Sequence, residues 1–197
     1  MKWLFITLCL MLSGCSILQP KMDFDAKTIQ VEISPGEFVD LPQPSALQQD
    51  INVSQLISAQ WGEENKQKLL VQLQVDQEKV VLAGFSAWGV KLLSITYFGK
   101  QSGNKIETHV MTGLGQTLPS PEQVLSNVML SIWPLDSWKN PLASIGWTLQ
   151  EANLQRLLID ENGHVVITID YQKMPYLDGK ITFKNQRLNY VVEIETK

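Results

Sequence analysis

The sequence predicts a mainly β domain, folded as a barrel or half-barrel of antiparallel strands with one helical interruption. Residues 68–75 alternate apolar and polar side chains, which is the pattern of a strand with one buried face. Roughly ten such strand candidates follow one another, and they flank a single helix candidate. Antiparallel strands in this number commonly curl around an interior that is filled by side chains or holds a ligand, with a β-sandwich as the alternative.

The first half of the chain is predicted to form hairpins. Residues 28–33 make a first strand candidate, and Pro35-Gly36 supplies the turn after it. Polar, turn-like residues at 76–78 and 101–104 separate later candidates. These later candidates are residues 52–61, 68–75, 79–85, 92–98 and 105–111.

One helix is predicted between the two sets of strands. Ser120 is a suitable N-cap, and Pro121 is favoured at the first helical position. Apolar side chains from Val124 to Ile132 fall on one stripe, which predicts about three turns. Trp133-Pro134 ends the helix because a residue before proline avoids the α region. The natural place for this helix is over the open end of the barrel.

Strands resume after a short helical turn predicted within residues 135–142. The strongest hairpin signal is Asn162-Gly163, which lies between two apolar runs. The strand candidates in this half are residues 154–159, 165–171, 180–184 and 190–195.

The N-terminus has the features of a secretory signal peptide. Lys2 gives a basic start, and the apolar run at residues 3–12 is shorter than the ~20 residues that span a bilayer. Leu12-Ser13-Gly14-Cys15 resembles the lipobox of bacterial lipoproteins. The resemblance implies that Cys15 becomes the first mature residue and carries acyl chains such as palmitate, which anchor the protein to a membrane.

Three segments follow from this reading: a signal peptide over residues 1–14, an acylated cysteine and tether over residues 15–27, and one domain over residues 28–197. Ser16 stands where Gram-negative lipoproteins retained at the inner membrane usually have Asp. We therefore expect an outer-membrane lipoprotein that faces the periplasm.

Charge and cysteine content exclude several classes of protein. The 197 residues include 16 Lys plus Arg and 20 Asp plus Glu, a net charge of −4, which argues against a nucleic-acid partner. The two cysteines are Cys9, within the predicted signal peptide, and Cys15. The mature domain is thus expected to fold without a disulfide in an oxidising compartment, and it has no thiol for a metal site or a nucleophile.

Patterns that would indicate catalysis are weak. Gly84-Phe85-Ser86-Ala87-Trp88 approaches the G-x-S-x-G motif of hydrolases, but tryptophan replaces its last glycine and another strand follows. Gly113 and Gly115 begin a glycine motif without a βαβ unit around it. His109 and His164 are more simply a strand residue and a solvated turn residue than metal ligands or acid–base groups. The sequence predicts no enzyme, no cofactor and no metal.

Trp88 is the most informative aromatic residue. It lies with Gly89 in a short connection between two strand candidates, where side chains are usually polar. A large apolar side chain that is exposed at such a tip marks a contact with a membrane or a partner. The alternative, in which Trp88 folds back onto the sheet, fits the composition equally well.

Several motifs occur here in the order found in the outer-membrane lipoprotein receptor LolB, and the chain resembles that family. It resembles still more closely a family of uncharacterised LolB-like lipoproteins associated with aryl-polyene lipid biosynthesis. The motifs are the lipobox ending at Cys15, the strands joined at Ala87-Trp88-Gly89, the helix ending in Leu130-Ser131-Ile132-Trp133-Pro134, the strand pair in residues 156–171 around Asn162-Gly163, and the closing strands 179–183 and 190–194.

This resemblance implies a half-open antiparallel β-barrel, LolB/LolA-like, with a helical lid over an apolar cavity that binds acyl or polyene chains. It also implies a membrane-contact loop, where Trp88 before Gly89 stands in the position of an exposed leucine in LolB, and a LolA-like periplasmic carrier as partner. Tryptophan prefers the interfacial region of a bilayer. The candidate cavity-lining residues are Leu69, Val71, Leu73, Leu82, Val128, Met129, Ile132 and Trp133.

Two functions are consistent with these sequence features. In the first, the lipoprotein binds acyl or polyene chains and helps to transfer or localise a lipid or lipoprotein cargo. In the second, its barrel is filled by side chains and it holds a protein partner at the outer membrane as a structural or assembly lipoprotein. Alternation alone does not decide which face of each strand points inward.

Overall fold

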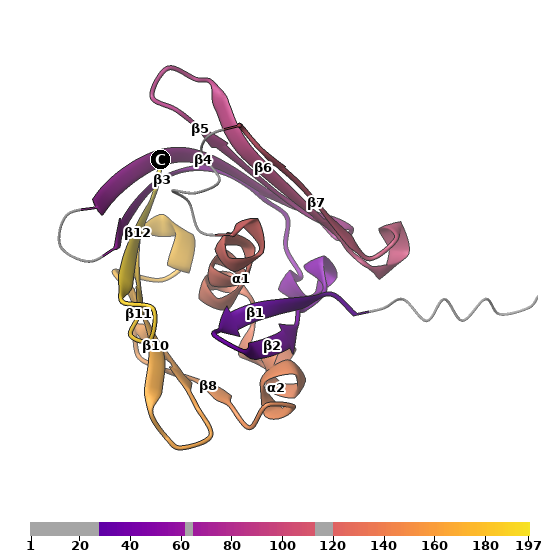
Figure 1. Ribbon diagram of the computed structural model, residues 1–197, viewed down its shortest axis with the longest axis vertical. Coiled ribbons are helices and arrows are strands. Elements are labelled where there is room, and N and C mark those ends of the chain that lie inside the picture. Colours follow the sequence, from indigo (N-terminus) through magenta and orange to yellow (C-terminus); the bar gives the residue numbers. More distant parts are fainter. Residues whose placement is uncertain (1–27, 62–64, 113–119) are drawn as a thin grey trace, which may run out of the picture.

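The computed structural model describes residues 28–61, 65–112 and 120–197 (Figure 1). The predicted signal peptide, the acylation site Cys15 and the tether up to residue 27 lie outside these residues, as does the Gly113-x-Gly115 motif.

Ten strands form one antiparallel sheet. The first five in chain order are β3 (Ile51–Trp61), β4 (Asn65–Val75), β5 (Lys79–Phe85), β6 (Lys91–Phe98) and β7 (Lys105–Val110). The other five are β8 (Thr148–Ala152), β9 (Gln155–Ile159), β10 (Val165–Tyr171), β11 (Lys180–Asn185) and β12 (Tyr190–Thr196). Their spatial order is β7-β6-β5-β4-β3-β12-β11-β10-β9-β8, so β7 and β8 are edges and the sheet is not closed. The predicted half-open, mainly β architecture is confirmed.

The sheet consists of two meanders that join in its middle. Strands β3 to β7 pair with their neighbours in sequence, and so do β8 to β12. The pairing of β3 with β12 connects the two sets, with Trp61 opposite Tyr190 and Gln55 opposite Thr196. The sheet curves strongly, which gives it a concave face (Figure 1).

Two helices lie on the concave side. The first, α1 (Pro121–Ile132), begins where predicted, because the Ser120 hydroxyl accepts a hydrogen bond from the Gln123 amide at 3.2 Å. It lies inside the curve of the sheet (Figure 1), rather than over one end. The second, α2 (Leu135–Ala143), follows directly and ends beside β8. None of the helices described is long and apolar enough to cross a membrane.

A separate hairpin and three short 3₁₀ turns complete the fold. The hairpin consists of β1 (Gln30–Ser34) and β2 (Glu37–Asp40), with Gly36 at a φ of 81° in its turn, and β1 packs against α1. The turns are η1 (Pro44–Leu47), η2 (Lys100–Ser102) and η3 (Tyr176–Asp178). In the part of the chain that the structure describes, the hydrophobic core extends from Val31 to Ile194.

Two strands were not predicted. The strand β2 has only four residues, too few for an alternating pattern to be distinguished. The edge strand β8 is mostly exposed. Its sequence Thr-Leu-Gln-Glu-Ala has almost no apolar face, so it lacks the alternation by which a strand is predicted. The remaining strands begin and end within three residues of the predicted positions.

Candidate functional site

An apolar cavity of about 140 Å³ lies between α1 and the concave face of the sheet. A buried water needs ~10–15 Å³ by the same measure, so the cavity has space for on the order of ten water-sized groups. Its walls are mostly apolar. The lining residues are Ile57, Ala59, Trp61, Gln67, Lys68, Leu69, Val71, Leu82, Leu92, Leu93, Val124, Asn127, Val128, Phe183, Tyr190, Val192 and Ile194.

Strand alternation places these side chains on one face. Every second residue of β3 from Ile57 to Trp61 lines the cavity, and so does every second residue of β12 from Tyr190 to Ile194. The register brings Ile57 directly opposite both Leu69 of β4 and Ile194 of β12. The junction of the two meanders is therefore also a wall of the cavity.

Gly84 makes room at the β4–β5 wall. A Cβ atom at this position would lie 2.6 Å from Cδ2 of Leu69 and 3.1 Å from Cγ of Leu93, two side chains that line the cavity. Glycine therefore lets both leucines pack against the strand rather than project into the cavity.

The first half of α1 forms the opposite wall through Val124, Asn127 and Val128. The Asn127 amide donates a hydrogen bond of 2.8 Å to the Tyr190 hydroxyl, which links this half of the helix to β12. Burial raises the pKa of Tyr190, and its hydrogen bonds with Asn127 and Asn185 offset only part of that effect. The phenol stays neutral, so the cavity contains no charge from this residue.

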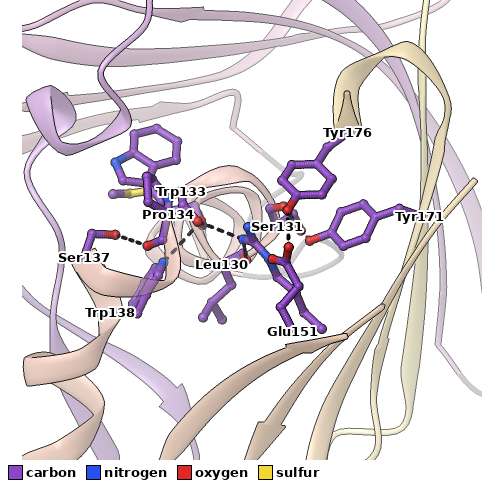
Figure 2. Close-up of polar contacts among 11 residues, drawn as sticks. Leu130, Ser131, Trp133, Pro134, Ser137, Trp138, Glu151, Tyr171 and Tyr176 are labelled. Atoms are coloured by element: carbon purple, nitrogen blue, oxygen red, sulfur yellow. Dashed lines mark hydrogen bonds and ion pairs between the residues drawn. The ribbon is translucent and has the colours of Figure 1, made fainter. Parts of the chain in front are cut away.

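The other end of α1 is held by Arg156 of β9, whose side chain is only 2% exposed. Its Nη1 donates to the carbonyl oxygens of Leu130 at 2.9 Å and Trp133 at 2.8 Å, and its Nε donates to Glu151 Oε2 at 2.7 Å (Figure 2). A cation at the C-terminus of a helix also interacts favourably with the helix dipole.

Two tyrosines complete this anchor. The Tyr171 hydroxyl donates to the Ser131 carbonyl at 2.6 Å, and the Tyr176 hydroxyl donates to Glu151 Oε1 at 2.6 Å (Figure 2). Burial alone would lower the pKa of Arg156, but its contacts with Tyr171, Glu151 and Tyr176 raise that pKa above its ordinary value. The guanidinium therefore stays charged, and the C-terminal end of α1 is fixed while its first half covers the cavity.

Trp88 lies at the tip of the β5–β6 hairpin and is 92% exposed. The Ser86 hydroxyl accepts hydrogen bonds from the amides of Trp88 at 3.3 Å and Val90 at 3.2 Å, and Gly89 has a φ of 77°. The folded-back alternative for Trp88 is therefore not the one observed. Ser86, the serine of the incomplete hydrolase motif, shapes this turn.

Other exposed apolar side chains surround the tip. Val90 is in the same turn, and the Met111 amide donates a hydrogen bond to the Leu92 carbonyl. Leu70 is also exposed, but it alternates with Leu69 and Val71 and therefore points to the other face of the sheet from the cavity. Leu92 lines the cavity, so the turn that contains Trp88 and Val90 leads within a few residues into the cavity wall. We call the three exposed side chains of Trp88, Val90 and Met111 the apolar rim.

The eight predicted cavity residues lie at three places. Leu69, Val71, Leu82 and Val128 line the cavity. Leu73, Met129 and Trp133 are fully buried but do not line it, and Ile132 lines a second hollow. Trp133 donates from its indole nitrogen to the Gln43 carbonyl at 3.1 Å, so it packs towards the segment before β3.

Sequence reasoning missed the contributions of β3, β6, β11 and β12. Alternation within residues 57–61 carried a usable signal, since Ile57, Ala59 and Trp61 are apolar at every second position. No comparable local signal indicated that β12 would pair with β3.

Both histidines are exposed, His109 on β7 and His164 after the Asn162-Gly163 turn. In the part of the chain that the structure describes, no three His, Cys, Asp or Glu side chains lie close enough together to hold a metal ion.

Comparisons with known proteins give a family but no curated relative. A crystal structure of a LolA superfamily protein from Nitrosomonas europaea has a TM-score of 0.44 and 8% identity, and the match covers 80% of this chain and 92% of that one. A putative outer membrane lipoprotein-sorting protein domain from Vibrio parahaemolyticus has a TM-score of 0.39 and 7% identity, over 75% and 83% of the two chains. No curated protein sequence matches. A family model described as "protein of unknown function (DUF3261)" matches residues 52–197, nearly the whole of the ten-stranded sheet, and the chain belongs to that family.

Proposed function

We propose that the protein binds acyl or polyene chains in the cavity under α1 and helps to transfer or localise a lipid or lipoprotein cargo. The observation that carries this proposal is the mostly apolar cavity, whose wall at Leu92 follows within a few residues of Trp88 and Val90 in the apolar rim. The cavity lining is mostly apolar, with Lys68 as its one charged residue in the part of the chain that the structure describes. Such a lining favours a hydrocarbon chain, and burial of apolar surface contributes about 25 cal/mol per Å². The rim would offer such a chain a route between membrane and cavity.

The proposed setting is the periplasmic face of the outer membrane. An acylated Cys15 would anchor the protein, and Trp88 with Gly89 would contact the interfacial region of the bilayer. A LolA-like carrier is the proposed source of cargo. We propose binding rather than catalysis, since the Ser86 hydroxyl accepts two backbone hydrogen bonds in the turn.

Displacement of a fluorescent fatty acid by unlabelled fatty acid tests this function. The assay uses residues 16–197, which include every core residue that the structure describes, from Val31 to Ile194. We expect saturable binding, and we expect Val192→Trp, which fills the cavity, to weaken it more than tenfold. Excluding only two methylenes costs about 1.6 kcal/mol, which already exceeds a factor of ten.

Val191→Trp is the matched control, because Val191 is on the opposite face of the same strand. It should keep the affinity of the unchanged protein, and circular dichroism should show that both variants fold. The absence of saturable binding in the unchanged protein, or equal binding by both variants, would contradict the proposal.

A further inference from the structure

A second hollow of about 830 Å³ lies on the same side of the sheet, towards the other end of α1. Its walls include Ile51 and Val53 of β3 and Ile132 of α1, with Glu151 and Arg156 among its polar residues. The first cavity is mostly apolar with Lys68 in its lining, whereas this hollow is bordered by several charged residues: Asp50, Asp136, Glu151, Arg156 and Asp178. The two spaces follow one another under the same helix.

Only a short stretch of structure separates them. Along α1, the lining changes from Val128 to Ile132, which are four residues and about 6 Å apart. Along β3, it changes from Ile57 to Val53. The one residue of β3 between them that points to the concave face is Gln55, and it lines neither space.

Gln55 is a buried amide on the concave side of β3. It is 2% exposed, and it is directly opposite Val71, which lines the first cavity, and Thr196. Its Nε2 donates to Thr196 Oγ1 at 3.5 Å, the long limit of a hydrogen bond. A hydrocarbon chain that moved past Gln55 would have to displace this side chain and leave an amide buried against methylenes, which is unfavourable.

We propose that Gln55 separates the acyl cavity from the second hollow and so sets the length of chain that the cavity accepts. This inference rests on the proposed function. A bound chain extends from the apolar rim towards Gln55 and ends there, and any longer chain leaves its remaining methylenes outside the cavity.

A series of saturated fatty acids that increases by two methylenes per member tests the role of Gln55 in the displacement assay. For the unchanged protein, affinity should rise about fourfold per methylene and then reach a plateau. Gln55→Ala shortens this side chain and extends the cavity towards Val53. It should therefore move the plateau to longer fatty acids, by at least one member of the series. Gln55→Leu fills nearly the same volume and should leave the plateau in place.

Ser58→Ala, on the opposite face of β3, is the control and should behave as the unchanged protein. An unmoved plateau in Gln55→Ala, with binding intact, would overturn this inference and leave the proposed function standing. Equal shifts in the Ala and Leu variants would also overturn it, because a general loosening of the fold would then explain both. Failure of every protein to bind fatty acid would instead refute the proposed function.

Discussion

Asp160 shows how one side chain shapes a hairpin of this domain. Its Oδ1 accepts hydrogen bonds from the amides of Asn162 at 2.9 Å and His164 at 2.8 Å, and its Oδ2 pairs with Arg187 at 2.6 Å. Burial opposes ionisation of the carboxyl, but these hydrogen bonds and the positive charge of Arg187 outweigh it and lower the pKa of Asp160 below 3.8. The turn that the sequence indicated most strongly is thus stabilised by an ionised aspartate.

The lowered pKa gives a pH-dependent prediction. A carboxyl whose pKa is lower in the folded state stabilises the fold above its unfolded value of 3.8, and this contribution is lost as pH falls through the folded pKa. Asp160→Asn should therefore reduce the free energy of unfolding at pH 7, and the difference should shrink below about pH 4. Urea denaturation between pH 7 and pH 3 measures this, with the exposed Asp178→Asn as control. A difference that stays constant down to pH 3 would refute it.

At the scale of single elements, the two ends of α1 are held differently. The C-terminal end is fixed by Arg156 and the two tyrosines, whereas the half above the cavity has the Asn127–Tyr190 hydrogen bond and apolar contacts. An element held firmly at one end can adjust at the other, which would suit the proposed entry of a hydrocarbon chain beneath this helix.

Removal of the anchor should strongly destabilise the domain. Arg156→Met leaves the Glu151 carboxylate and the carbonyls of Leu130 and Trp133 without their cation, and breaking a buried pair costs about 3–5 kcal/mol. Lys184→Met removes an exposed pair with Asp170 and should cost less than about 1 kcal/mol. Urea denaturation at neutral pH compares the two. Similar losses would show that Arg156 is not the anchor inferred here.

The elements that were predictable from sequence are those with a strong local pattern. The alternation at residues 68–75 marked β4, and Ser120-Pro121 marked the start of α1. Alternation specifies which side chains share a face but not how far along that face a cavity extends. Leu69 and Leu73 are therefore equivalent in sequence, although Leu69 lines the cavity and Leu73 is packed in the core. The pairing of β3 with β12 is non-local, so no local pattern reveals it.

At the scale of the whole molecule, the apolar rim defines one side that suits a membrane surface. Lys68 and Lys91 are exposed beside it, and lysines next to an apolar tip favour anionic phospholipid headgroups. An exposed tryptophan in this position could enter the interfacial region without unfolding any strand.

Trp88→Ser should therefore reduce binding to vesicles that contain anionic phospholipid by at least about tenfold, because Trp side chains bury large areas. Co-sedimentation of residues 16–197 with vesicles measures the effect. Phe38→Ser is the control, since Phe38 is another large exposed apolar residue but lies in the β1–β2 hairpin. If both substitutions reduce vesicle binding equally, the rim has no special role in membrane contact.

The central pairing of β3 with β12 also has a consequence for the order of folding. Each meander can form from contacts between neighbouring strands, but Trp61 and Tyr190 are separated by most of the domain, so their pairing closes a long loop and should come late. Because both strands form walls of the cavity, an incompletely folded chain has no enclosed site for a hydrocarbon chain. Under the proposed function, only molecules that have finished folding would therefore bind cargo.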